Sequence, residues 1–190
     1  MVGAVLLASG AGRRFGSNKL LARVGGVPLY RRAMAALSPA GFGRMAVCSP
    51  YPEILSAGAA WGFLPLDHPG AAEGISAAIR LGVAAMAGMD GALFAVCDQP
   101  FLTTESIKNL IFAFEESKDA ICALSWRGQR GSPAVFPAAL FGELAALTGD
   151  AGGSAVIRRH PGRLRLVEAL SPAELSDVDT PADLPGGRPG

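Results

Sequence analysis

Small and cationic residues gather where an apolar run near the start of the chain ends. The run GAVLLA at 3–8 is followed by SGAGRRFG at 9–16, which contains Arg13 and Arg14, and Lys19 comes shortly afterwards. Glycines let backbone N–H groups approach phosphate oxygens closely, and nearby cations offset the phosphate charge. We therefore expect this loop to bind the phosphates of a ligand.

A glycine-rich loop alone is often only a tight connection between a strand and a helix, so its spacing matters. A Walker loop has four residues between its glycines, whereas five residues separate Gly10 from Gly16, and Lys19 does not follow a glycine. A dinucleotide-binding GxGxxG loop is also disfavoured, because Gly10, Gly12 and Gly16 form GxGxxxG and no acidic residue precedes Glu53. The loop fits neither of these two common nucleotide-binding patterns.

Charge is distributed unevenly along the chain. The first 52 residues carry seven basic residues and no aspartate or glutamate, although the whole chain has a net charge of only +1. Such a block favours a polyanionic ligand near the N-terminal part. Arg31, Arg32 and Arg44 are expected to be solvated surface residues. We also expect Lys19 to lie at the surface, so that its replacement by alanine leaves the melting temperature nearly unchanged.

A carboxylate follows a second apolar run. Asp98 comes directly after ALFAVC at 92–97 and precedes Gln99 and Pro100. An aspartate before a proline is often a cap or turn residue. Enzymes that act on phosphates, however, commonly hold Mg²⁺ through one or two carboxylates. Because the cationic loop opens at the same predicted edge, we favour a metal-binding role for Asp98.

A second acidic group lies near the C-terminus. The segment DVDTPADL at 177–184 offers Asp177, Asp179 and Asp183. Thr180 and the proline after it predict the start of a helix. Asp179 is then either an N-cap or a metal ligand, and Asp183 is expected to be solvated.

Short apolar runs alternate with helical patterns, which predicts an α/β fold with a mostly parallel sheet covered by helices on both faces. In such sheets, ligands bind beyond the carboxyl ends of the strands. Strands are expected at 3–8, 44–48, 62–66, 91–97, 119–125, 133–136 and 163–168, and helices at 28–38, 73–87, 104–116, 137–147 and 152–159.

Composition bounds the class of protein. A chain of 190 residues with 50% hydrophobic residues predicts a single domain over 1–184, with PGGRPG at 185–190 as a flexible tail. Cys48, Cys97 and Cys122 have no metal-binding or disulfide spacing, which favours a reduced, cytoplasmic compartment. No apolar stretch approaches the roughly 20 residues needed to span a bilayer.

Five motifs together carry a family resemblance. LLASGAGRRFGSNKLL at 6–21 resembles the signature of nucleotidyltransferases with a GT-A-like fold, which is L-A-x-G-x-G-x-R-x-G followed by a lysine. CDQPFL, RGSPAVF, GDAGGSAVI and DVDTPADL then follow in the family's order, at 97–102, 130–136, 149–157 and 177–184. Over nearly the whole chain they are similar to the molybdenum cofactor cytidylyltransferases. The resemblance implies a three-layer α/β/α, Rossmann-like fold of the nucleotidyltransferase type.

The resemblance also implies roles for individual residues. Arg14, Lys19 and Asp98 would be catalytic, and Asp98 and Asp179 would hold Mg²⁺. The nucleotide would be bound by Leu7, Ala8, Ser9, Gly10, Gly12, Arg14, Lys19, Gly74 and Ser76, and the second substrate by Gly131, Ser132, Pro133, Gly149, Asp150 and Gly153. Family members continue with a longer amphipathic helix after D-x-D-T-P, whereas here PGGRPG follows. That difference puts the rigidity of Asp179 in question.

The activity implied by the resemblance is Mg²⁺-dependent transfer of CMP from CTP to the molybdopterin cofactor. Its ligands would be CTP or another nucleoside triphosphate and a molybdopterin-type phosphorylated acceptor. A molybdoenzyme or its chaperone would be a transient partner, with no nucleic acid or membrane involved. Three alternatives stay open: a guanylyltransferase on the same cofactor, a nucleotidyltransferase for another phosphorylated small molecule, and a non-catalytic accessory protein that binds the cofactor. Ser9 matches neither the Ala-Gly-Gly typical of guanylyl members nor the Ala-Ala-Gly frequent in cytidylyl members.

Overall fold

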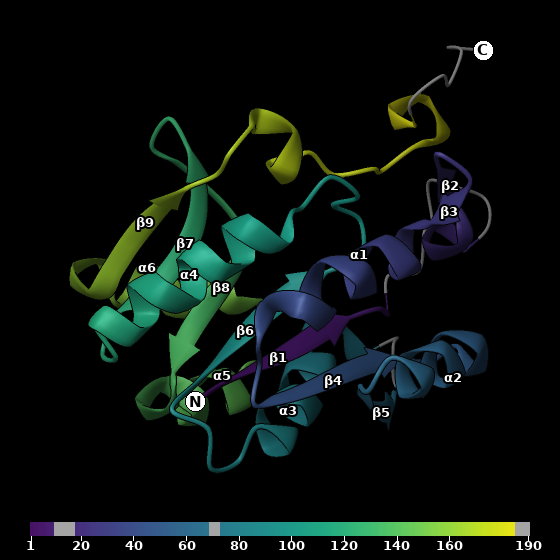
Figure 1. Ribbon diagram of the computed structural model, residues 1–190. Helices are drawn as coiled ribbons and strands as arrows, with labels where there is room; N and C mark the ends of the chain where they lie inside the picture. The colour runs from purple at the N-terminus through teal and green to yellow at the C-terminus, as the bar shows by residue number, and fades with distance from the viewer. Residues whose placement is uncertain (10–17, 69–72, 185–190) are drawn as a thin grey trace.

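The computed structural model describes residues 1–9, 18–68 and 73–184, and it contains a seven-stranded sheet between two layers of helices (Figure 1). The strand order is β5-β4-β1-β6-β8-β7-β9, and β8 alone runs antiparallel to its neighbours. The strands are β1 (Val2–Leu7), β4 (Arg44–Ser49), β5 (Leu64–Asp67), β6 (Gly91–Val96), β7 (Ile121–Trp126), β8 (Gln129–Pro137) and β9 (Leu164–Glu168). A small hairpin, β2 (Arg23–Val24) and β3 (Val27–Pro28), lies apart from this sheet.

Helices cover both faces of the sheet. The α-helices are α1 (Leu29–Leu37), α2 (Pro52–Ala60), α3 (Ile75–Ala85), α4 (Thr104–Glu116), α5 (Phe141–Ala145) and α6 (Gly153–Arg159). The 3₁₀ turns are η1 (Lys19–Leu21), η2 (Ser38–Ala40), η4 (Ala138–Leu140), η5 (Pro161–Arg163), η6 (Pro172–Leu175) and η7 (Pro181–Asp183). None of the helices in the described ranges combines the length and apolar composition that crossing a bilayer requires.

Two apolar cores follow from the alternation of side chains along the central strands. In β1, Ala4 and Leu6 join the core under α1, α2 and α4, whereas Val5 and Leu7 join the core under α3, α5 and α6. Every residue of β1 is buried, as expected for a central parallel strand covered on both faces. The expected fold class is confirmed, and helix 104–116 has the predicted bounds.

Some elements differ from the expectations. Helix α2 was not expected, because only Ile54 and Gly58 are buried on it and such a short pattern gives no apolar stripe. Gly58 is required there, since a Cβ would lie 2.5 Å from Val47 Cγ1. The expected helix at 137–147 consists of a 3₁₀ turn and the short α5, and the expected helix after Thr180 is the single turn η7. The segment 185–190 lies outside the described residues.

A C-terminal segment runs from the end of β7 to the loop that follows β6. This strap, residues 169–180, leaves β9, forms η6 and continues toward the β2–β3 hairpin, as the yellow trace in Figure 1 shows. It is tied down at both ends: Ala169 N donates to Ser125 O at 2.8 Å, and Val178 N donates to Asp98 O at 2.8 Å. The strap thus brings the C-terminal carboxylates to the ligand-binding edge of the sheet.

Candidate active site

One ammonium group lies between two carboxylates at the carboxyl edge of the sheet. Lys19 Nζ donates to Asp98 Oδ2 at 2.8 Å and to Asp179 Oδ1 at 3.1 Å. A third contact, at 3.4 Å, goes to Val178 O. The structure therefore brings together three side chains that the sequence motifs place far apart, and all three were expected to be functional.

Local structure fixes the position of Lys19. Asn18 caps η1 by accepting a hydrogen bond from Leu20 N through its side chain, at 3.1 Å. Leu20 is buried and holds the turn against the core, so Lys19 extends along the sheet edge. Lys19 is only 8% exposed, and the expectation that it lies at the surface is wrong. Two opposite charges within hydrogen-bonding distance make this burial possible.

The strap positions its acidic residues through the residue between them. Val178 is buried against Val24 and Leu29, and its neighbours on either side therefore face away from this small core. Asp179 contacts Lys19, whereas Asp177 lines a cavity that Asp98 also lines.

Asp183 is exposed, as expected, and its carboxylate closes the turn that follows Asp179. Its Oδ2 accepts from Thr180 N at 2.7 Å, from Asp179 N at 3.0 Å and from Thr180 Oγ1. The hydrogen bonds from Thr180 and Asp179 lower the pKa of Asp183. The turn supports Asp179 even though only a short 3₁₀ turn follows.

A buried carboxylate anchors the middle of the strap to α4. Glu174 is 1% exposed, and its oxygens accept from Thr103 Oγ1 at 2.6 Å and from Ser106 Oγ at 2.5 Å. Thr103 is also the N-cap of α4, where it accepts from Ser106 N. Because α4 begins shortly after Asp98, Glu174 connects the strap to the loop that carries Asp98.

The electrostatics of the cluster follow from burial and mutual charge. Burial lowers the pKa of Lys19, but the hydrogen bonds and charges of Asp98 and Asp179 outweigh burial and raise that pKa above its ordinary value. Partial desolvation and the charge of Asp98 raise the pKa of Asp177, against a hydrogen bond from Gln99 that lowers it. Negative charge is therefore concentrated at this edge.

The cluster has the donor set of a site for a hard cation. Asp98 Oδ1 is buried and has no hydrogen-bond partner among the described residues. The described ranges contain no group of three or more His, Cys, Asp and Glu residues placed to hold a metal, so the protein side would supply Asp98 and Asp179. Mg²⁺ is commonly bound in this way, by one or two carboxylates together with substrate phosphates and water. The residues present fit Mg²⁺.

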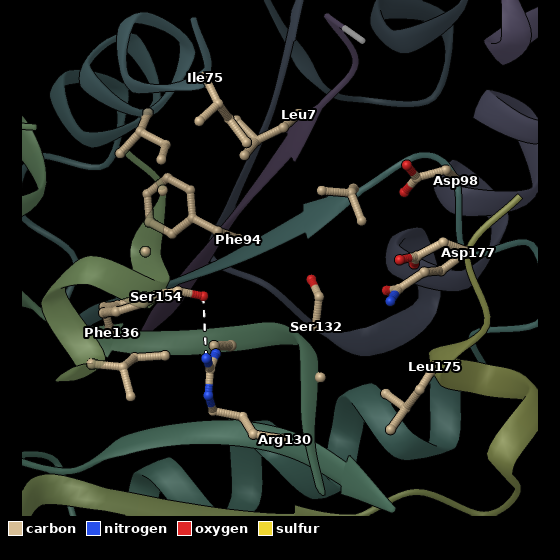
Figure 2. Close-up of a pocket in the computed structure, with 18 of the residues that line it drawn as sticks. Leu7, Ile75, Phe94, Asp98, Arg130, Ser132, Phe136, Ser154, Leu175 and Asp177 are labelled. Atoms are coloured by element: carbon tan, nitrogen blue, oxygen red, sulfur yellow. Dashed lines mark hydrogen bonds between the residues drawn. The ribbon is translucent and has the colours of Figure 1, made fainter. Parts of the chain in front are cut away.

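A cavity of about 680 Å³ opens beside this cluster (Figure 2). Figure 2 shows Asp98 and Asp177 near each other at one end, while Arg130 donates to Ser154 Oγ at 3.2 Å elsewhere along the wall. The remaining walls are largely apolar and aromatic. They include Leu7, Ile75, Phe94, Val96, Trp126 and Phe136.

The structure distributes the residues expected at the second substrate over two places. Gly131, Ser132 and Gly153 line the cavity. A Cβ on Gly131 would lie 2.6 Å from Leu175 of the strap, and one on Gly153 would lie 2.7 Å from Phe136. These glycines therefore set the shape of the cavity wall. Pro133, Gly149 and Asp150 do not line it.

The Gly149–Asp150 loop instead contacts the start of α3. Ser76 N donates to Gly149 O at 3.2 Å, and a Cβ on Gly74 would lie 2.4 Å from that same carbonyl oxygen. Gly74 has a φ of +87°, which favours glycine. Ser76 is buried, and its hydroxyl accepts from Arg80 Nη1 at 3.3 Å. Its role in binding the nucleotide stays a prediction.

The rest of the expected nucleotide site is described in part. Leu7 lines the cavity, Ala8 is buried and donates from its N–H to Cys48 O, and Ser9 is partly buried. Gly10, Gly12 and Arg14 lie outside the described residues.

The cavity residues that were not assigned a role from the sequence include Gln99, Trp126, Arg130 and Asp177. Gln99 directly follows Asp98, and Arg130 begins the RGSPAVF motif, so proximity to a motif was a signal for both. Asp177 belongs to DVDTPADL but was not chosen. Trp126 carries no signal, because its place depends on the turn between β7 and β8.

Known proteins share this fold and parts of this sequence. The chain is 26% identical over 202 residues to the purine catabolism protein PucB of Bacillus subtilis (strain 168), covering 94% of this chain and 92% of PucB. A nucleotidyl transferase from Methanothermobacter thermautotroptrophicus superposes with a TM-score of 0.80 and 25% identity, over 96% of this chain and 94% of that one. Rv0371c from Mycobacterium tuberculosis H37Rv superposes with a TM-score of 0.78, 25% identity and the same coverage.

Two further results concern the fold and the family. A structure of Rv0371c in complex with manganese has a TM-score of 0.77 and 24% identity, over 96% of this chain and 95% of that one, and at that identity it shows the fold alone. The family model of the MobA-like NTP transferase domain matches residues 4–164, which include Lys19, Asp98 and the strands β6, β7 and β8. The chain therefore belongs to the family of MobA-like NTP transferase domains and is a nucleotidyltransferase of that general kind.

Proposed function

We propose that the protein transfers CMP from CTP to the terminal phosphate of the molybdopterin cofactor, in a Mg²⁺-dependent reaction that releases pyrophosphate. The observation that carries the proposal is the Lys19 ammonium held between Asp98 and Asp179 beside the open cavity. It gives one cation and two carboxylates at the place where a triphosphate and an acceptor would meet. Membership of the MobA-like family supports nucleotidyl transfer. The acceptor is supported by the sequence motifs that resemble those of the molybdenum cofactor cytidylyltransferases.

The reaction needs positioning and neutralisation of charge more than it needs a covalent intermediate. An oxygen of the acceptor phosphate attacks the α-phosphorus of CTP, the bond to the bridging oxygen breaks, and pyrophosphate leaves. A terminal phosphate is already anionic at neutral pH, so no residue has to remove a proton from it. Lys19 and Arg14 would hold the triphosphate and stabilise the departing pyrophosphate.

The two carboxylates have a complementary role. Asp98 and Asp179 would hold Mg²⁺, which when bound neutralises the charge of the phosphate oxygens and favours attack at the α-phosphorus. Asp98 is fixed by the end of β6 and by Val178 N, which donates to its carbonyl oxygen. Asp179 is fixed by the strap.

The cavity suits a ring system that carries an anionic group. Its volume of about 680 Å³ lies within the range of roughly 300–1,000 Å³ usual for small-molecule sites. Phe94, Trp126 and Phe136 supply flat apolar walls, and Arg130 supplies a cation. Both features support a phosphorylated, pterin-type acceptor in this cavity.

A non-catalytic carrier of the cofactor is the rival from a different class. The paired carboxylates around Lys19 argue for the enzyme, because a protein that only carries the cofactor needs no cation site. The preference for CTP over GTP depends on the RGSPAVF and GDAGGSAVI motifs.

The test is pyrophosphate release from CTP, GTP, ATP and UTP with Mg²⁺, in the presence and absence of molybdopterin cofactor. We expect release only when CTP and the cofactor are both present. Thermal shift with each nucleotide ranks the bases, since a ligand at 100 times its Kd adds about 2.7 kcal/mol of apparent stability. Faster release or a larger shift with GTP would reverse the base assignment. A cofactor that binds without any pyrophosphate release would favour the carrier.

A further inference from the structure

We infer that Lys19 is an internal counter-cation that competes with the divalent metal for Asp98 and Asp179, so that metal enters together with the nucleotide and not before it. This inference rests on the proposed function where it names the nucleotide. Its central claim, competition between an ammonium group and a metal, concerns this chain alone.

The geometry places the ammonium where the two carboxylates converge. Lys19 Nζ is 2.8 Å from Asp98 Oδ2 and 3.1 Å from Asp179 Oδ1, so one cation already joins the two groups. The strap and the β6 loop are thereby held together by the lysine in the ligand-free protein. A metal bound by both carboxylates has to take that place, and the ammonium has to leave it.

Burial makes the competition strong. Lys19 is 8% exposed, so its charge is only weakly screened by solvent in this position. A divalent ion placed between Asp98 and Asp179 is repelled by the ammonium that contacts both carboxylates, and this repulsion is strong at a partly buried edge. Negative charge from a triphosphate offsets the repulsion and offers the ammonium new acceptors. The nucleotide is therefore the natural destination of Lys19 when the metal arrives.

Asp177 is itself a carboxylate, so it cannot take the place of Lys19 as the counter-cation of Asp98 and Asp179. Its carboxylate adds negative charge beside Asp98, which raises the affinity for any cation at this edge. Asp98 Oδ1, which has no hydrogen-bond partner within the described part of the chain, has the same effect. Both features favour the binding of any cation, whether it is an ammonium group or a metal ion. They therefore do not decide between the two, and the competition depends on the position that Lys19 already occupies.

The first experiment uses the unmodified protein and no nucleotide. The chain has three lysines, Lys19, Lys108 and Lys118, and the last two are exposed. Acetylation with acetic anhydride, followed by mass spectrometry, reports the reactivity of each amine, with Lys108 and Lys118 as references in the same molecule. We expect Lys19 to react several-fold more slowly than Lys108 in the ligand-free protein. Mn²⁺ is then added until its binding, monitored by electron paramagnetic resonance, is saturated. This should raise the reactivity of Lys19 toward that of Lys108.

The second experiment compares Mn²⁺ affinity without nucleotide in the wild type, Lys19→Met and Lys118→Met. Lys118 is a matched control, because its ammonium lies 2.8 Å from Asp90 in an exposed ion pair at the opposite end of β6. Removal of the competing charge should make Mn²⁺ bind at least about tenfold more tightly to Lys19→Met. Lys118→Met should bind as the wild type does.

The outcomes separate this inference from the proposed function. Equal or weaker Mn²⁺ binding by a folded Lys19→Met variant overturns the competition, and so does Lys19 reactivity that saturating Mn²⁺ leaves unchanged. The reactivity experiment decides the question if the variant does not fold. Neither experiment depends on CTP or on molybdopterin, so failure to transfer CMP would reject the proposed function and leave the competition intact.

Discussion

Replacing Glu174 tests whether the strap is held by its buried carboxylate. Glu174 is 1% exposed and accepts hydrogen bonds from Thr103 Oγ1 and Ser106 Oγ, so Glu174→Ala leaves two hydroxyls of the first turn of α4 without these acceptors. A hydrogen bond to a charged group contributes about 1.5–3 kcal/mol. Thr103 still accepts from Ser106 N, which limits the loss. We expect Glu174→Ala to lower the free energy of unfolding by about 3 kcal/mol, and Glu174→Gln by about half of that because it keeps one acceptor.

Urea unfolding measures the free energy of unfolding of each variant. Glu105→Ala serves as the control, because Glu105 is an exposed glutamate in the first turn of α4, the turn that Glu174 contacts. The strap also carries Leu175 and Asp177 into the cavity wall, so Glu174→Ala should raise the KM for the acceptor more than the KM for the nucleotide. A loss of stability below about 0.5 kcal/mol, the level of an ordinary surface substitution, would refute the role of Glu174 as the anchor.

Three further predictions concern the site. Lys19→Ala should lower the free energy of unfolding by about 1–3 kcal/mol, between the values for exposed and buried ion pairs; urea unfolding checks this, and an unchanged midpoint would contradict the burial of Lys19. Gly74→Ala should lower the free energy of unfolding by about 1–3 kcal/mol, because φ at Gly74 is +87° and the new Cβ would collide with Gly149 O. The KM for nucleotide should also rise, and normal kinetics and stability would reject the contact. The pKa of Asp177 is raised in the folded protein, so ionisation of this carboxyl group opposes folding above that pKa, and the penalty is absent in acid. Asp177→Asn should therefore be more stable than the wild type at pH 7 and should lose that advantage near pH 3. A stability difference that does not change with pH would refute the reasoning.

The fold could be predicted because its signals are local. Alternating apolar runs and helical patterns indicate a covered, mostly parallel sheet, and the helix predicted at 104–116 has the bounds of α4. Asp98 could be placed at the ligand edge because a buried strand ends just before it. Helix α2 escaped prediction, since its contact with the sheet depends on the absence of a side chain at Gly58.

The site could be predicted only in part, because its decisive contacts join distant positions. Lys19 is buried through partners 79 and 160 positions along the chain, and no local pattern shows that a lysine after a glycine loop has them. Glu174 resembles an ordinary helix-turn glutamate until the structure places it on α4. The cavity wall depends equally on the course of the strap beside Gly131.

The central claim is that Asp98 works with Lys19 and a divalent metal in nucleotidyl transfer. Asp98→Asn keeps the shape of the side chain and most of its hydrogen bonding but removes the charge that a hard cation requires. The decisive measurement is turnover of wild type, Asp98→Asn and the control Asp90→Asn across a Mg²⁺ titration, with melting temperatures to confirm folding. Asp90 is a suitable control because its exposed ion pairs lie at the opposite end of β6. We expect Asp98→Asn to lose turnover by about 10²–10³-fold or more, as for the loss of a preorganised electrostatic contact, while Asp90→Asn stays active. Normal turnover of Asp98→Asn at ordinary Mg²⁺ concentrations would contradict the account.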